Sequence, residues 1–207
     1  SWLPGFVYNI PATKLIQIDI DPSEIAKNYP VDMGVVGDIK TVLNQLIKKS
    51  ETDSDKGDYK AWFEELGGYR KEWNDFVTPF ETSDESPIDP RRLISDIRNS
   101  TPKDTIMFSD VGNNQPWVEQ YWSSDIPGTH FTAGGFAAMG FGVCGVLGAK
   151  LARPETTCVN VCGDGGFMMM PHAVATAVQY NLPAVWVIMN NYAIGAIRDL
   201  QRLYFGG

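Results

Sequence analysis

The sequence predicts an α/β fold in which a parallel β-sheet is flanked by helices. From residue 88 onward, short apolar runs alternate with longer segments whose apolar residues recur at helical spacing. Strands that alternate with helices of this length form parallel sheets that are covered on both faces. The chain has 207 residues, of which 43% are hydrophobic, so it can bury the core of one or two domains.

The first part of the chain, residues 1–49, has a short strand–helix–strand–helix pattern. Residues 14–20 alternate apolar and polar side chains, as a half-buried strand does, and residues 35–36 form a second short strand. A short helix that begins at Pro22 separates the strands, and an amphipathic helix follows over 39–48. Because no further strand accompanies them, we interpret this part as the end of a larger domain.

Residues 50–87 predict a connector. Both of its ends, 50–58 and 81–87, are polar and charged, which is typical of surface segments. Between them, residues 59–76 carry aromatic and apolar side chains at spacings of three and four. This spacing predicts a helix that packs an aromatic stripe against a domain surface.

The remaining residues, 88–207, contain the predicted sheet. We expect helices over 89–99, 135–152, 168–180 and 193–204, strands over 105–109, 156–162 and 183–189, and a short extended segment over 130–132. The last helix runs to the end of the chain, and the chain begins without Met or a signal-peptide pattern. We therefore expect a truncated domain within a longer polypeptide.

Composition excludes several classes of protein. The formal net charge of −8 argues against a nucleic-acid partner, because no broad basic face is available to neutralise phosphates. No apolar run is long enough for a membrane span. The three cysteines include no Cys-X-X-Cys pair, which favours a reducing, cytoplasmic location over a disulfide framework or a structural zinc site.

The strongest functional signal lies at two strand ends. Gly163-Asp164-Gly165-Gly166 follows the strand at 156–162, and Asn190-Asn191 follows the strand at 183–189. One helix lies between them, so the chain returns parallel to its start. If the two strands are neighbours, their carboxyl ends meet at one edge of the sheet, which is where open α/β sheets bind ligands.

The residue types at this edge suit a metal ion and a diphosphate. Mg²⁺ prefers oxygen ligands, typically one or two protein groups together with phosphates and water. Asp164 offers a carboxylate, Asn191 an amide oxygen, and Ala193 a backbone carbonyl. Gly165 and Gly166 precede the predicted helix at 168–180, and without Cβ atoms they let a phosphate approach backbone N–H groups.

Four segments resemble one family in its own order. GDGGF…IMNN resembles the thiamine-diphosphate signature, and SDVGNNQPW (109–117) and TAGGFAAMGFG (132–142) resemble cofactor-facing segments of acetolactate synthase-type enzymes. Residues 14–38 resemble the last part of their middle domain. The resemblance implies a thiamine-diphosphate-binding fold over 88–207, preceded by a connector and by the end of a Rossmann-like middle domain.

The resemblance also implies roles for individual residues. Asp164, Asn191 and the Ala193 carbonyl match the ligands of Mg²⁺. Met139 matches the apolar residue that holds the cofactor bent, and the Ala137 carbonyl matches the acceptor of its 4′-amino group. The residues that match the diphosphate-binding positions are Gly163, Gly165, Gly166, Asn113 and Asn114, where the family often has a His in the asparagine pair.

The implied activity is cleavage or formation of a carbon–carbon bond beside a carbonyl, with 2-oxo acids or related small carbonyl compounds as substrates. The family's activating glutamate belongs to an amino-terminal domain that no segment here matches, so we expect the 207 residues alone to be inactive. The resemblance further implies a homo-oligomer with active sites between subunits. It also raises FAD as a second cofactor, with Asp19, Asp21 and Asp38 as candidate contacts.

Two alternatives stay open. Within the family, the chain could come from a 2-oxo acid decarboxylase, a sulfoacetaldehyde acetyltransferase or a cyclic 1,2-diketone hydrolase. From a different class, Gly140-Phe141-Gly142-Val143-Cys144-Gly145 spells the Gly-X-Gly-X-X-Gly pattern of a nucleotide-binding module. That pattern lies inside a predicted helix instead of directly after a strand, which disfavours a dinucleotide site.

Overall fold

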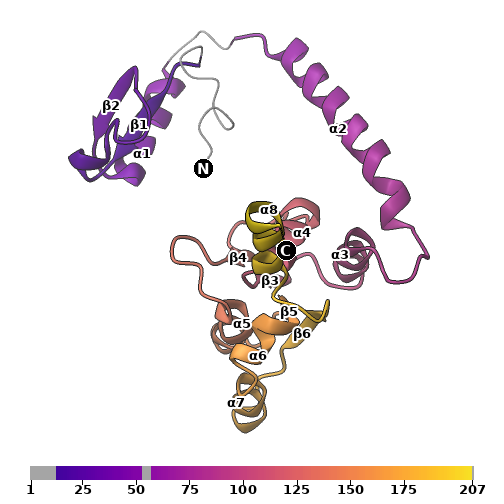
Figure 1. The fold of residues 1–207 in the computed structure, drawn as a ribbon. Coiled ribbons are helices and arrows are strands. Elements are labelled where there is room, and N and C mark those ends of the chain that lie inside the picture. The colour runs from indigo at the N-terminus through magenta and orange to yellow at the C-terminus, as the bar shows by residue number, and fades with distance from the viewer. Residues whose placement is uncertain (1–12, 53–56, 207) are drawn as a thin grey trace. The chain divides into compact units, whose positions relative to one another are not determined.

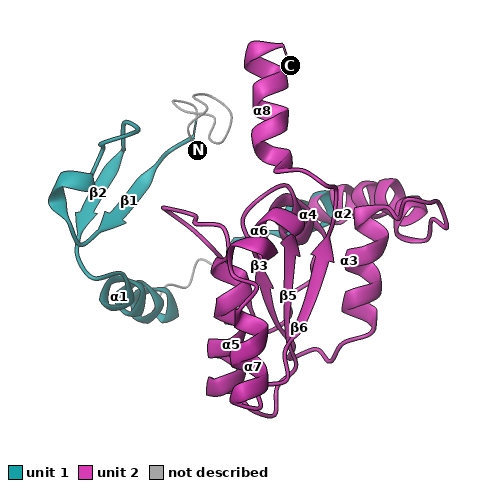
Figure 2. Ribbon diagram, turned by 60° about the horizontal axis from the view of Figure 1, so that its bottom comes forward, with its two compact units in different colours: residues 1–65 teal, residues 66–207 magenta. Residues whose placement is uncertain are grey.

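The computed structural model describes residues 13–52 and 57–206, and the chain divides into two compact units, residues 1–65 and 66–207 (Figure 2). The division falls within the segment that the sequence predicts as a connector. The first unit holds two strands, a short 3₁₀-helix and an α-helix: β1 (Ile16–Asp19), η1 (Pro22–Glu24), β2 (Met33–Val36) and α1 (Ile39–Glu51). The second unit contains the larger sheet.

In the first unit, β1 and β2 pair in parallel, with Ile16 opposite Met33 (Figure 1). Two aspartates begin the helices that follow the strands. The Asp21 side chain accepts a hydrogen bond from the Ser23 N–H at 2.8 Å, and the Asp38 side chain accepts one from the Thr41 N–H at 2.8 Å. These caps satisfy amides that the first helical turn leaves unpaired. The strand–helix–strand–helix order expected from the sequence is confirmed.

The predicted aromatic helix is α2 (Lys60–Glu81), which continues five residues beyond the predicted end. Its last turns pack on the second unit, where Trp73 stacks on Tyr121 with ring centroids 5.8 Å apart, and Val77 is buried. All seven side chains of the predicted stripe are nevertheless exposed, Trp73 included. The prediction that the stripe packs against a domain surface is therefore wrong for the described residues, apart from the Trp73–Tyr121 contact. Within the described residues, no helix is long and apolar enough to cross a membrane.

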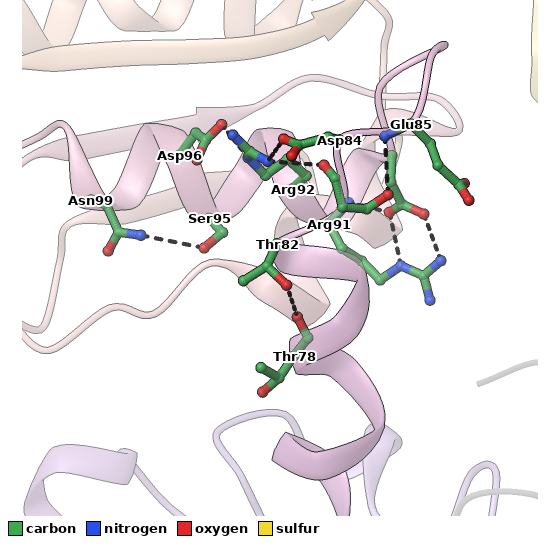
Figure 3. Close-up of polar contacts among 11 residues, drawn as sticks. Thr78, Thr82, Asp84, Glu85, Arg91, Arg92, Ser95, Asp96 and Asn99 are labelled. Carbon is green, nitrogen blue, oxygen red and sulfur yellow. Dashed lines mark hydrogen bonds and ion pairs between the residues drawn. The ribbon is translucent and has the colours of Figure 1, made fainter.

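The turn after α2 is bound to α3 (Pro90–Asn99) by Arg92 (Figure 3). The Arg92 guanidinium donates to the Ser83 carbonyl at 2.9 Å and to the carboxylates of Asp84 and Asp96 at 3.1 and 2.7 Å. Arg91 binds Asp89 through two hydrogen bonds of 2.8 and 2.7 Å. The Arg92 contacts hold the polar end of the connector against the sheet domain, whereas the Arg91–Asp89 pair lies within the start of α3.

Four parallel strands in the order β4-β3-β5-β6 form the sheet of the second unit, as the alternating pattern predicts. Their bounds are β3 (Ile106–Ser109), β4 (His130–Thr132), β5 (Cys158–Gly163) and β6 (Val185–Met189). β5 and β6 are direct neighbours, with Gly163 opposite Met189. The condition on which the predicted site depends, adjacency of these two strands, is therefore met.

Helices cover both faces of this sheet (Figure 2). On one face, α5 (Phe141–Ala152) and α7 (Ala173–Gln179) pack on a core that includes Phe108 and Cys162. On the other face, α3 and α4 (Asn114–Tyr121) pack on Met107 and Val161. Consecutive residues of each strand thus serve opposite cores, as the strand period of two requires.

Three predicted helices of the sheet domain are wrong in their bounds. The segment predicted as one helix over 135–152 is helical only from Phe141, because Ala137 and Gly140 adopt positive φ angles of 48° and 89°. The segment predicted over 168–180 is two helices, α6 (Asp164–Met169) and α7, separated at Pro171. Proline in a helix interior removes a backbone donor and clashes with the preceding turn. The last helix, α8 (Gly195–Phe205), starts two residues later than predicted.

Candidate active site at the carboxyl edge of the sheet

A cavity of about 880 Å³ opens at the carboxyl ends of β5 and β6. This volume lies within the range of small-molecule and cofactor sites. The structure brings all ten residues predicted for the site into the lining of this one cavity: Asn113, Asn114, Ala137, Met139, Gly163, Asp164, Gly165, Gly166, Asn191 and Ala193. They come from the ends of β3, β5 and β6 and from the loop before α5.

Asp164 and Asn191 lie at the same edge, each just beyond one of two neighbouring strands. Asp164 begins α6, and it is the only residue with a formally charged side chain among the described residues that line the cavity. The Asn191 side-chain oxygen accepts a hydrogen bond from the Ala193 N–H at 3.1 Å, which folds the chain after β6 into a tight turn. Of the three candidate metal ligands, Asn191 and Ala193 thus lie in the turn after β6, and Asp164 lies at the start of α6.

The donor set is that of a hard cation. The described residues contain no cluster of three or more His, Cys, Asp and Glu side chains. A metal at this edge would rest on one carboxylate and on neutral oxygens, which matches Mg²⁺ bound together with phosphates and water. A soft-metal site with thiolate or imidazole ligands does not fit these residues.

Asn114, a residue of the cavity lining, contains a buried acceptor without a partner among the described residues. Its amide group is buried, and its Nδ2 donates to the carbonyls of Asp110 and Val161 at 2.7 and 3.2 Å. Its Oδ1 has no hydrogen-bond partner among the described residues and lies 3.7 Å from the place of a Cβ at Gly163. A buried oxygen of this kind calls for a bound water, cation or N–H group. Together with Asp164, it makes this edge rich in acceptors.

Asn113 faces the start of α8. Its Nδ2 donates to the Asp199 carboxylate at 2.7 Å, and this hydrogen bond, with a smaller contribution from Arg198, lowers the pKa of Asp199. A Cβ placed on Gly195 would lie 2.8 Å from Asn113 Nδ2 and 2.9 Å from Asn191 Nδ2. The two asparagine side chains therefore converge on the first residue of α8, where only glycine leaves room for both.

The two glycines after Asp164 lie within the first turn of α6 and not in a loop before a later helix, which corrects the predicted start at 168. A Cβ on Gly165 would lie 3.3 Å from the Met139 methyl and 3.4 Å from Ile194 Cγ1. At Gly166 a Cβ would overlap the Asp110 carboxylate. Position 166 therefore requires glycine because of Asp110, a reason that the sequence argument did not contain.

Met139 and Ala137 reach the cavity from the loop that precedes α5. The Met139 methyl lies against Gly165, as the distance above shows, so an apolar side chain packs over the start of α6. Ala137 adopts a φ of 48°, which L-residues rarely adopt. Such backbone geometry at a cavity wall is typical of functional loops.

Sequence reasoning missed the apolar wall of the cavity and the helix that supplies part of it. The further apolar residues of the lining include Leu93, Trp117, Ile194 and Ile197. The helix α4 was not predicted, although Trp117, Val118 and Tyr121 follow Asn114 at helical spacing. That spacing would have found it. Leu93 gave no such signal, because only the folded sheet brings α3 beside the edge.

Comparisons with known proteins agree with this architecture. Residues 110–207 match the C-terminal TPP-binding domain of thiamine pyrophosphate enzymes, and residues 5–46 match the central domain of the same enzymes. The fold, the cavity and these matches define the class: the chain belongs to the thiamine pyrophosphate enzyme family.

Its curated relatives include acetolactate synthase large subunits. The probable large subunit of Methanocaldococcus jannaschii is 36% identical over 205 residues, which cover 96% of this chain and 34% of that protein. The isozyme 3 large subunit of Escherichia coli is 32% identical over 200 residues, covering 95% of this chain and 34% of that protein. The chain therefore spans about a third of the length of the relatives it matches.

Proposed function

We propose that this chain forms the Mg²⁺- and diphosphate-binding part of an acetolactate synthase-like enzyme that acts on small 2-oxo acids. The observation that carries the proposal is the charge of the cavity lining. Asp164 is negative, and the oxygens of Asn114 and Asn191 add two acceptors at the same edge. A cation between this carboxylate and a diphosphate would remove the repulsion between their like charges.

In this proposal Asp164, Asn191 and the Ala193 carbonyl hold Mg²⁺. The backbone of Gly163, Gly165 and Gly166 and the side chains of Asn113 and Asn114 face the diphosphate. Asn114 acts through its free oxygen, accepting from water of the Mg²⁺–diphosphate group, since its amide N–H groups are already used by carbonyls. The Ala137 carbonyl accepts from the amino group of the cofactor.

When bound, thiamine diphosphate supplies a nucleophilic carbon that adds to a carbonyl and takes up the electrons released by carbon–carbon cleavage. The residues of this chain position that group and exclude water. Met139 packs against Gly165 and provides an apolar support within the cavity. Trp117 and Ile197 extend the apolar lining, which lowers the local dielectric and strengthens electrostatic interactions inside the cavity.

Product analysis of the full-length protein tests the proposed reaction. Incubated with pyruvate, thiamine diphosphate and Mg²⁺, it should release CO₂ and form acetolactate. Mass spectrometry identifies acetolactate by its mass, which equals that of two pyruvates minus one CO₂. Acetaldehyde as the main product would instead assign a decarboxylase, one of the alternatives within the family. The expectation that residues 1–207 alone are inactive stays a prediction, checked by the same assay.

The nucleotide-binding alternative makes a different prediction about thermal unfolding. A ligand that binds only the folded protein raises its melting temperature. Thiamine diphosphate with Mg²⁺ should raise the melting temperature of the full-length protein, and NADH should leave it unchanged. The Gly-X-Gly-X-X-Gly pattern does not favour NADH, because it spans Gly140–Gly145 at the start of α5 and follows a loop, not the end of a strand.

FAD is a separate proposal with less support. The three candidate contacts already make local hydrogen bonds: the carboxylates of Asp21 and Asp38 cap helices, and Asp19 accepts from the Asp21 N–H at 2.9 Å. Flavin absorbance of the purified full-length protein decides whether FAD is bound.

We also propose a cytoplasmic homo-oligomer with active sites between subunits. Support comes from exposed apolar side chains next in sequence to the cavity lining: Phe136 precedes Ala137, and Tyr192 lies between Asn191 and Ala193. All three cysteines are free thiols, as a reducing compartment favours. Light scattering on the full-length protein measures the oligomeric state, and a monomer would contradict this part.

A further inference from the structure

Asp110 is a buried carboxylate that the proposed site does not use. It follows β3 directly, and its side chain is completely buried. Its backbone N–H donates to the Val161 carbonyl at 2.9 Å, and its own carbonyl accepts from Asn114 Nδ2 at 2.7 Å. The main chain of Asp110 is therefore fixed between β5 and α4, and its carboxylate is held in place.

The carboxylate binds the start of α5. Its Oδ2 accepts from the Gly140 N–H at 3.1 Å, and its Oδ1 accepts from the Gly142 N–H at 3.0 Å. The residue that begins this helix is Gly140, which has no side chain to cap the first turn. Asp110, which lies just after β3, caps the helix instead: its carboxylate accepts hydrogen bonds from two backbone amides of the first turn.

The space around the carboxylate admits little movement. A Cβ on Gly142 would lie 3.0 and 3.1 Å from the backbone N and Cα of Asp110, and a Cβ on Gly166 would overlap the Asp110 carboxylate. Glycines in α5 and α6 thus let both helices close on one side chain. Asp110 contacts the first turns of both helices and so fixes the position of one relative to the other.

The loop before α5 depends on this contact. Among the described residues, Asp110 is the only one whose side chain hydrogen-bonds to the backbone of residues 133–142. Phe136 is fully exposed, and a Cβ on Gly134 or Gly135 would meet nothing within 4 Å. Ala137 and Met139, which line the cavity, lie between this open stretch and the anchored Gly140.

We propose that Asp110 is a positioning residue for the cofactor: it fixes the start of α5 and so holds Ala137 and Met139 in the cavity before the cofactor binds. The inference rests on the proposed function, since it assumes that thiamine diphosphate is the ligand of this cavity. A loop that is ordered in advance binds its ligand more tightly, because less conformational entropy is lost on binding.

Hydrogen exchange of the unsubstituted full-length protein, without cofactor, is the first test. Peptide fragments should show slow exchange for the amides of Gly140 and Gly142 and fast exchange for residues 134–138. Equally fast exchange across 134–142 would overturn the inference, whether or not any variant folds.

The second test is the variant Asp110→Asn, which keeps the size of the side chain but turns one acceptor toward the loop into a donor. We expect its dissociation constant for thiamine diphosphate, at saturating Mg²⁺, to rise about tenfold, which is the effect of losing a helix cap. Exchange at 139–142 should rise with it. The matched control is Val146→Ala, a buried position of α5, which should lower the melting temperature but leave the dissociation constant unchanged.

Each outcome of the binding test has one meaning. If the unsubstituted protein does not bind thiamine diphosphate, the proposed function is wrong, and so is this inference. If it binds and Asp110→Asn binds equally well, the proposed function stands and the positioning role is wrong. If Val146→Ala weakens binding as much as Asp110→Asn, the effect reflects general destabilisation, which also overturns the positioning role.

Discussion

At the scale of single residues, the site is defined by the chemistry of Asp164 and of the neutral oxygens near it. No other residue with a charged side chain lines the cavity in the described parts of the chain. A cation between an anionic ligand and this carboxylate replaces their repulsion with two attractions. Asp164 is therefore the residue whose substitution should most affect metal binding.

We predict that Asp164→Asn in the full-length protein lowers the affinity for Mg²⁺, in the presence of thiamine diphosphate, about ten- to a hundredfold. Losing a charged interaction typically costs ~1.5–3 kcal/mol. Calorimetric titration with Mg²⁺ measures the change. Asp125→Asn, at an exposed loop position outside the cavity, is the control and should bind Mg²⁺ normally. An unchanged affinity in Asp164→Asn would remove this residue from the metal site.

The sequence located these residues because they follow strands directly. Asp164 and Asn191 each occupy a position that a parallel sheet carries to its carboxyl edge, so strand order alone brings them together. The reason for glycine at position 166 could not be predicted in this way. It depends on Asp110, which is more than fifty residues earlier in the chain and reaches Gly166 only in the folded domain.

At the scale of elements, α5 shows how closely a helix can approach a sheet when its contact face lacks Cβ atoms. Gly142 lies against Asp110, and Gly145 lies against Phe108, whose Cε1 is 2.6 Å from the place of a Cβ. Gly148, on the same helix, has nothing within 4 Å of that place. Packing therefore requires glycine at positions 142 and 145 but not at position 148.

This difference gives a matched pair of variants. Gly142→Ala should lower the free energy of unfolding by ~1–3 kcal/mol, because the added methyl group has no room between α5 and the end of β3. Gly148→Ala should raise it by up to ~1 kcal/mol, because alanine is the better helix former where space is open. Urea unfolding of the full-length protein measures both. Equal effects of the two substitutions would contradict the close packing described for Gly142.

The elements that the sequence predicts poorly are those whose ends are set by distant contacts. Small residues over 135–152 suggest one helix, yet the helix starts at Phe141, next to the carboxylate that binds Gly140 and Gly142. Pro171 is a local signal for a helix break, and the prediction of one helix over 168–180 did not take it into account. The strands were predicted well, because apolar runs bounded by polar turns need no tertiary information.

At the scale of the whole molecule, the chain matches two domains of thiamine pyrophosphate enzymes. Its family matches cover a central-domain segment and the cofactor-binding domain, and its relatives are about three times as long. Within the second unit, every residue predicted for the cofactor and metal lines one cavity. The proposal therefore depends on whether one ion joins Asp164 and Asn191 when cofactor is present.

A crystal structure of the full-length protein with thiamine diphosphate and Mn²⁺ in place of Mg²⁺ tests this claim most directly, because anomalous scattering locates the metal independently. We predict one Mn²⁺ peak within ~2.2 Å of an Asp164 carboxylate oxygen, Asn191 Oδ1 and the Ala193 carbonyl, with diphosphate oxygens completing the site. A peak elsewhere, or a bound cofactor with no metal touching both side chains, would contradict the account.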